Sequence, residues 1–187
     1  MKKKNKYIVV IILVLFLSVG YAYLSTNLDI NGVSIVKRNV WDLHFENIVD
    51  THKGATIDIP ANISEDKLSI DYQVTLNKPG DEYYFYADIV NKGTMDVMLN
   101  NYEITGLTDE QKKFITATVT YNDGTELKQY DLLEKTEGKD TLKIYVKYRT
   151  DIEVEDLPSK GDSEFRLNLT ATYVMADENA KLRSNKS

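Results

Sequence analysis

The fold is decided by the alternation that runs through residues 68–76, whose sequence is Leu-Ser-Ile-Asp-Tyr-Gln-Val-Thr-Leu. Every second side chain is apolar and the ones between are polar, which is the period of a β-strand with one buried face. The same alternation recurs in residues 142–148 and 165–173. A shift of one residue would place the apolar side chains of any of these runs in water, so each register is well specified.

Three further runs show the same period, and turn signals separate the runs from one another. The additional runs are residues 41–46, 83–89 and 115–121. The turn signals combine glycine with Asn, Asp or Pro within a few residues, which suits reversals of the chain. They are residues 78–81, 91–93 and 122–124. Only residues 109–113 and 127–134 have the character of short helices.

Strands with one apolar and one polar face predict two sheets packed against each other. We therefore expect an all-β protein, a two-sheet β-sandwich of jelly-roll or immunoglobulin-like type, preceded by one N-terminal hydrophobic helix. The strand order stays open. The expected organisation is residues 1–22 as a signal peptide or uncleaved membrane anchor, 23–36 as an N-terminal strand segment, 37–175 as the β-sandwich domain and 176–187 as a polar flexible tail.

Composition excludes several classes of function. The 187 residues include no Cys, which rules out disulfides, thiolate metal sites and Cys nucleophiles. The net charge of −6 argues against a general nucleic-acid-binding protein, which needs a basic face. At 42% hydrophobic residues the chain has enough apolar side chains to bury a core.

The N-terminus has the order of a secretory signal. Four lysines within residues 2–6 precede an apolar run from Tyr7 to Val19. Gly20 and Ala22 provide small side chains at the positions that a signal peptidase requires before a cut, so that Tyr23 would begin the mature chain. We expect export, with signal peptidase as one partner.

An uncleaved membrane anchor is the alternative to cleavage. The apolar run from Tyr7 to Leu24 is 18 residues long, at the lower edge of the roughly 20 that a transmembrane helix needs. The lysines would then stay cytoplasmic. In either case the body of the protein faces the exterior, as a secreted protein or as a cell-surface protein held in the plasma membrane.

The exported body is strongly acidic. All 29 Asp and Glu, but only 19 of the 23 Lys and Arg, lie after residue 22, which gives that part a net charge of −10. Such a chain is soluble and self-repelling at low salt. Export without any Cys is typical of a bacterial surface protein rather than of a eukaryotic secretory domain.

Two segments are candidates for contacts with other molecules. Within residues 23–36, the apolar side chains of the candidate assembly segment are Leu28, Ile30, Val33 and Ile35. This segment either pairs with its own sheet or adds a strand to the open edge of a neighbouring copy, in which case the chain forms a homopolymer. The second candidate is a stripe of outward-facing tyrosines, which either forms a contact surface or simply suits half-buried strand positions; it consists of Tyr84, Tyr86 and Tyr145.

No catalytic, cofactor or metal site is expected. His44 and His52 are the only histidines, and both are expected to face solvent. Calcium could bridge the acidic residues between 151 and 164, but no EF-hand loop is present, and such charged runs are usually solvated. A serine hydrolase would need an elbow motif that the chain lacks.

Three segments resemble the camelysin/TasA-type exported proteins of Gram-positive bacteria. Residues 19–26, Val-Gly-Tyr-Ala-Tyr-Leu-Ser-Thr, are similar to the end of that group's leader. Lys78-Pro79-Gly80-Asp81, followed by an aromatic strand and by residues 90–94, is similar to a stretch of the same group. Residues 40–48 are similar to a segment of surface proteins that carry this leader.

The resemblance implies a jelly-roll-like sandwich and an exported role as a fibre-forming biofilm-matrix or surface protein. Some members of the group are described as metallopeptidases, but this chain lacks a zinc-ligand pattern, so no catalytic residue is assigned. The leading hypothesis is a non-enzymatic structural protein that acts by self-association or adhesion. The alternatives are a membrane-tethered binding domain that does not polymerise, and a secreted hydrolase.

Overall fold

The computed structural model describes residues 11–17, 38–153, 157–158 and 164–183. The chain divides into two compact units, residues 1–38 and residues 39–187. In the first unit, residues 11–17 are helical, and all seven of their side chains are exposed. Within the described ranges, no helix is both long and apolar enough to cross a membrane.

The second unit is built from strands, as the alternation predicted. Nine strands and one turn of 3₁₀-helix follow one another along its described part. They are β1 (Leu43–Lys53), β2 (Thr56–Ile63), β3 (Ser69–Thr75), β4 (Glu82–Asn91), β5 (Val97–Thr105), η1 (Gln111–Lys113), β6 (Ile115–Tyr121), β7 (Leu132–Leu133), β8 (Gly138–Tyr148) and β9 (Glu164–Met175).

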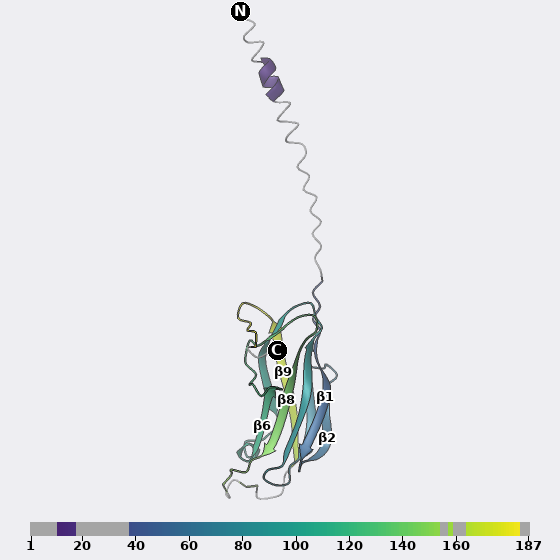
Figure 1. Ribbon diagram of the computed structural model, residues 1–187, viewed down its shortest axis with the longest axis vertical. Coiled ribbons are helices and arrows are strands. Elements are labelled where there is room, and N and C mark those ends of the chain that lie inside the picture. The colour runs from purple at the N-terminus through teal and green to yellow at the C-terminus, as the bar shows by residue number, and fades with distance from the viewer. Residues whose placement is uncertain (1–10, 18–37, 154–156, 159–163, 184–187) are drawn as a thin grey trace, which may run out of the picture. The chain divides into compact units, whose positions relative to one another are not determined.

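The strands form two antiparallel sheets with a β-sandwich-like arrangement (Figure 1). Sheet A has the order β1-β4-β8-β6, and sheet B has the order β2-β3-β9-β5-β7. Among these strands only β2 and β3 follow each other within one sheet, so every other connection passes from one sheet to the other. This winding brings strands that are distant in sequence side by side, such as β4 beside β8 and β3 beside β9.

The core lies between the sheets and consists of the side chains that alternation assigned to the inner faces. From β4, Tyr83, Phe85 and Ala87 are fully buried, and from β8, Leu142, Ile144 and Val146 are fully buried. An aromatic cluster joins the two layers, because the ring of Tyr72 on β3 lies 5.0 Å from that of Phe85, centroid to centroid. Burial of these large side chains is the main stabilising contribution to the fold.

Two of the turns that the sequence marked are held by a buried polar side chain. The Asp81 carboxylate accepts hydrogen bonds from the backbone N–H groups of Asn77 (2.9 Å) and Lys78 (3.1 Å). The Asn91 side chain donates to the carbonyl of Met95 (2.9 Å) and accepts from the N–H of Gly93 (3.0 Å). These turn residues therefore have a structural role, since they satisfy backbone groups inside the turn.

The expected helix at residues 127–134 is wrong. The Asp131 carboxylate instead accepts from the N–H of Lys128 at 2.8 Å, which closes a turn, and the short strand β7 follows. Trp41 also differs from expectation: it precedes β1 and is 47% exposed, although its alternation with Leu43 had placed it on the buried face. Residues 109–113 contain only the single turn η1.

The residues expected to form a flexible tail make specific contacts up to Arg183. The Arg183 guanidinium lies 3.7 Å from the ring centroid of Tyr121 and forms ion pairs with Asp123 (3.0 Å) and Asp140 (3.2 Å). Its side chain is only 14% exposed. The C-terminal segment is thus fixed against the end of β6 by an arginine that lies over the Tyr121 ring and pairs with two carboxylates.

Candidate interaction surface

The outward face of sheet A brings together the three tyrosines that the sequence singled out. The register places Tyr84 of β4 directly opposite Tyr145 of β8, and Tyr86 opposite Lys143. Each of these side chains is partly exposed, because their neighbours along the strand turn inward. Tyr84, Tyr86, Lys143 and Tyr145 are called the tyrosine–lysine face below.

The four side chains of the tyrosine–lysine face touch one another. The ring centroids of Tyr84 and Tyr86 are 5.9 Å apart with an edge-on geometry, and those of Tyr84 and Tyr145 are 6.4 Å apart. The Lys143 ammonium lies 4.7 Å from the Tyr84 centroid and 5.5 Å from the Tyr145 centroid. Cation–π attraction therefore holds a positive charge among the rings.

Threonines flank this face along the outer strands of sheet A. On β6, Thr118 lies opposite Tyr145 and Thr120 lies opposite Lys143. On β1, Thr51 lies opposite Tyr84. A cross-strand row thus runs Thr51, Tyr84, Tyr145 and Thr118 from one edge of the sheet to the other. The row combines apolar ring surface with hydroxyl donors and acceptors.

The carboxylates closest to this face are already bonded within the protein. Glu82 accepts a hydrogen bond from the Tyr145 hydroxyl and pairs with Lys53 at 3.4 Å. The hydrogen bond from Tyr145, more than Lys53, lowers the pKa of Glu82 below its ordinary value. In turn, burial and the Glu82 carboxylate raise the pKa of Tyr145.

Asp88 is the second carboxylate and is held by three donors. Its oxygens accept from Thr141 (2.6 Å), Asn47 (3.1 Å) and Lys139 (3.2 Å). Burial alone would raise the pKa of Asp88, but these hydrogen bonds outweigh it and lower the pKa. Both acids thus stay ionised and satisfied at neutral pH.

The sheet edges differ in how they are protected against pairing with another chain. Edge strand β2 contains Pro60 and two register shifts, and edge strand β1 contains one shift next to Asn47, which has a φ of 55°. Edge strand β6 pairs with β8 without any shift. Its sequence, Ile-Thr-Ala-Thr-Val-Thr-Tyr, has no charge, Pro or Gly. Shifts, prolines and charges are usual protections of an edge, and β6 has none of them. Only its end is covered, where Thr120 forms an antiparallel bridge with Glu126 and the N–H of Tyr121 donates to the carbonyl of Thr125.

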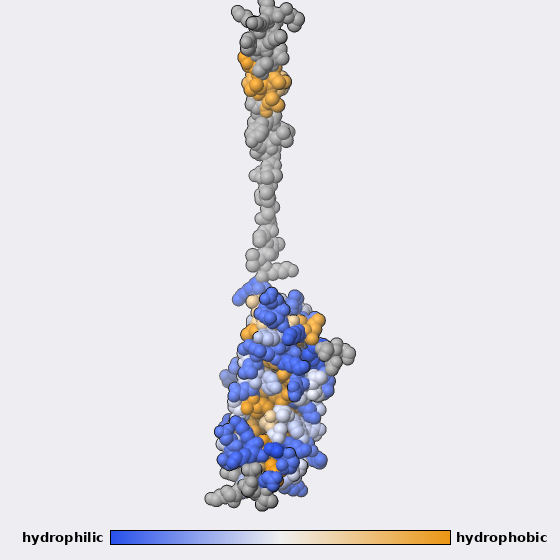
Figure 2. Space-filling view, turned by 90° about the vertical axis from the view of Figure 1, so that its left-hand side faces the viewer, coloured by the Kyte–Doolittle hydropathy of each residue, from blue (hydrophilic) through white to orange (hydrophobic). Residues whose placement is uncertain are grey.

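The side of the domain on which β6 lies also exposes apolar surface. Figure 2 shows hydrophobic side chains gathered in the middle of this side, with hydrophilic ones around them. Ala117 of β6 and Ile104 of β5 are among the partly buried side chains that pack against the core. An uncharged edge strand beside apolar surface has the signature of a segment prone to strand addition.

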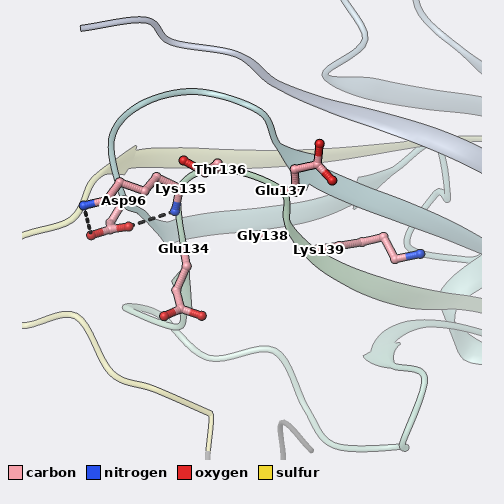
Figure 3. Close-up of a pocket in the computed structure, with 7 residues that line it drawn as sticks. All are labelled: Asp96, Glu134, Lys135, Thr136, Glu137, Gly138 and Lys139. Atoms are coloured by element: carbon pink, nitrogen blue, oxygen red, sulfur yellow. Dashed lines mark hydrogen bonds and ion pairs between the residues drawn. The ribbon is translucent and has the colours of Figure 1, made fainter. Parts of the chain in front are cut away.

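The hollow at the turn between β7 and β8 does not have the form of an active site. It measures about 560 Å³. Its charged side chains point in different directions, with Asp96 bonded to Lys135 and with Glu134, Glu137 and Lys139 directed away from one another (Figure 3). Catalysis by general acid and base requires groups that converge on one point.

The described residues hold no group of three or more acids or histidines that could bind a metal ion. His44 lies between Asp42 (2.9 Å) and Glu46 (3.5 Å), on the outward side of β1, and His52 is exposed near the end of the same strand. Three of the carboxylates in the predicted acidic cluster, those of residues 155, 156 and 162, lie outside the described ranges.

The cleavage residues and the assembly segment also lie outside the described ranges. The two groups of residues concerned are Gly20, Ala22 and Tyr23, and Leu28, Ile30, Val33 and Ile35. Sequence reasoning did not select Lys143 as a member of the tyrosine–lysine face. Its outward position follows from the alternation in β8, but its place beside Tyr84 depends on strand order, which one sequence does not reveal.

Comparisons of the chain with models of protein families, with curated proteins and with solved structures found no match.

Proposed function

We propose that this protein is an exported, non-enzymatic surface or matrix protein of a Gram-positive bacterium that acts by self-association through exposed strands. The observation that carries this proposal is the regular, uncharged edge of β6 before its bridge at Thr120. A regular, uncharged edge strand leaves a row of backbone N–H and C=O groups available to an added strand. The jelly-roll type agrees with the repeated crossing of the chain between the sheets.

The proposed donor is the assembly segment, residues 23–36, of a neighbouring copy. Its apolar side chains alternate with polar ones over residues 28–31, as a strand needs when one of its faces is buried. Donation from one copy to the β6 edge of the next is a head-to-tail contact. Such a contact does not close on itself and produces filaments.

Filament formation is tested by negative-stain microscopy of the purified exported protein and two kinds of variant. Deletion of residues 23–36 should abolish filaments, and so should Thr118→Lys, because Thr118 is an exposed residue of β6 and a lysine protects an edge. The matched control is Thr51→Lys, since Thr51 is exposed at the other edge of sheet A in the same cross-strand row. It should leave filaments intact.

Equal loss of filaments in both lysine variants would exclude β6 as the acceptor. Persistence of filaments in the deletion variant would exclude residues 23–36 as the donor. Circular dichroism of each variant establishes that the sheets are retained, so that unfolding is not mistaken for lost assembly.

A membrane-tethered domain that does not polymerise is the second candidate. It is favoured by the helix at residues 11–17, whose apolar side chains are all exposed and lie within the apolar run from Tyr7 to Leu24. Mass spectrometry of the N-terminus separates the two candidates. A chain that begins at Tyr23 supports release and assembly, whereas an intact lysine-rich leader supports the tether.

A further inference from the structure

Lys143 occupies an unusual position for a lysine. It lies at the centre of an outward sheet face and is partly buried among tyrosine rings. Within the described part of the chain it forms no ion pair, although the protein has more acids than bases. Cation–π contacts hold this ammonium on the face without a carboxylate partner, so an anionic ligand would supply the counter-charge that the described residues do not.

The neighbouring charges leave this position open to an anion. The outward carboxylates of β4 are those of Glu82 and Asp88. Glu82 forms an ion pair with Lys53, and Asp88 forms one with Lys139. Lys147 follows Lys143 by four residues on the same outward side of β8, about 13 Å further along the strand. Lys147 lies directly opposite Glu82 of β4, and its charge helps to lower the pKa of Glu82, so Lys147 already faces a carboxylate and Lys143 does not.

The rings beside Lys143 define the rest of the ligand. Tyrosine faces suit the C–H surfaces of a sugar ring, and the threonine hydroxyls of Thr118 and Thr120 suit its hydroxyl groups. The ammonium lies within 5.5 Å of two ring centroids, so ring and anion must be close together in the ligand. A sugar that bears its carboxylate directly on the pyranose ring meets both requirements at once.

We propose that the tyrosine–lysine face binds a linear acidic polysaccharide whose sugar rings carry carboxylates. Lys143 would pair with a carboxylate of the polymer, while Tyr84 and Tyr86 would pack against its rings. The face binds through side chains on the flat of sheet A and not through the backbone edge of β6, so this binding does not depend on self-association.

The test is isothermal titration of the full chain, in mild detergent, with polygalacturonate as the probe and neutral dextran as the uncharged control. Wild-type protein should bind polygalacturonate and not dextran. Lys143→Gln should weaken the affinity about tenfold, the usual effect of losing one charge-assisted contact. Lys128→Gln removes the same charge from an exposed residue outside sheet A and should change the affinity less than twofold.

Tyr86→Leu separates ring packing from charge, because it leaves Lys143 and its contact with Tyr84 in place. This variant should bind polygalacturonate several-fold more weakly. Equal weakening by Lys143→Gln and Lys128→Gln would overturn the proposal in favour of general charge attraction. Binding of polyphosphate, which has no rings, as tightly as polygalacturonate would also overturn it. Thermal melts of each variant show that the fold is retained.

Discussion

The outward faces of the two sheets follow the same strand rule but carry different chemistry. On sheet A, the central strands β4 and β8 present the tyrosine–lysine face. On sheet B, the adjacent strands β3 and β9 present only small, polar and charged side chains in their central rows. Asp71 lies opposite Asn168, and Gln73 lies opposite Arg166. Neither strand has an outward aromatic side chain.

This difference shows which strand positions are constrained by folding, those of the inner faces, and which are not, those of the outer faces. Both sheets bury an unbroken apolar inner face, because that face forms the core. The outer positions carry no such constraint, and sheet B shows that polar residues suffice there. The tyrosines and Lys143 of sheet A therefore exceed what folding requires, which is the reason for placing a ligand on that face.

Substitutions at two neighbouring residues of β8 test whether the inner face determines stability and the outer face does not. They have the largest expected effect. Leu142 faces the core and is fully buried, whereas Lys143 faces outward. Leu142→Ala should lower the free energy of unfolding by about 3 kcal/mol, through lost transfer free energy and the cavity left behind. Lys143→Gln should change it by less than about 0.5 kcal/mol. Urea denaturation followed by tryptophan fluorescence or circular dichroism measures both.

If Leu142→Ala and Lys143→Gln lower the free energy of unfolding equally, Lys143 contributes to the stability of sheet A, and its outward position is not free of folding constraints.

The inner face could be predicted from sequence because burial repeats with the strand period. Ile70, Tyr72 and Val74 alternate with polar residues, and all three are fully buried or nearly so. Prediction failed at two of the longer strands: β2 and β5 were not identified. In β5 the register shifts between Leu99 and Asn101, and the alternation breaks there. In β2 every second residue is apolar, but Pro60 lies in the middle of the run, and a proline weakens the strand signal.

The outer face was predictable only in part. Alternation identified Tyr84, Tyr86 and Tyr145 as outward residues, and the structure places them in contact. Their assembly with Lys143 depends on β4 pairing with β8, strands that are separated by some fifty residues of chain. Such long-range pairing leaves no local signal in one sequence. The same is true of the contrast between the β6 edge and the edges of β1 and β2.

One aspartate on each outer face allows a direct comparison of the two sheets: Asp88 on sheet A and Asp71 on sheet B. Asp88 is 7% exposed and accepts from Thr141, Asn47 and Lys139. The Asp71 carboxylate accepts one hydrogen bond from a side chain in the described residues, that of Asn168 at 3.1 Å. Asp88→Asn should cost about 2 kcal/mol of unfolding free energy, because a buried charged acceptor is lost and Lys139 loses its partner. Asp71→Asn should cost less than about 0.5 kcal/mol.

The measurement is again urea denaturation, at pH 7 and low salt. If the two asparagine variants are equally stable, the polar network around Asp88 does not distinguish sheet A from sheet B.

Tyr84 and Gln73 form the next pair, each central on its own sheet and directed outward. Tyr84→Ala removes two aromatic contacts and the cation–π contact with Lys143. We expect a loss of about 1 kcal/mol, typical of partly exposed aromatic and cation–π pairs. Gln73→Ala should be neutral to within about 0.5 kcal/mol. Thermal unfolding of both variants measures this difference. If Gln73→Ala is the less stable of the two, Tyr84 does not contribute more to stability than its counterpart on sheet B.

The smallest expected effect is the pH dependence that Glu82 contributes to sheet A. The hydrogen bond from Tyr145 lowers the pKa of Glu82 in the folded state, so the folded protein binds fewer protons than the unfolded chain. The resulting stability is present above the ordinary glutamate pKa and is lost as the pH falls through the folded pKa. Because Glu82 is partly solvated, we expect only a few tenths of a kcal/mol. Glu82→Gln should be less stable than wild type by this amount at pH 7, and the difference should shrink as the pH falls through the folded-state pKa of Glu82. A difference that stays constant from pH 7 to pH 3 would show that the Glu82 charge does not stabilise the face, and that Tyr145 is held by packing alone.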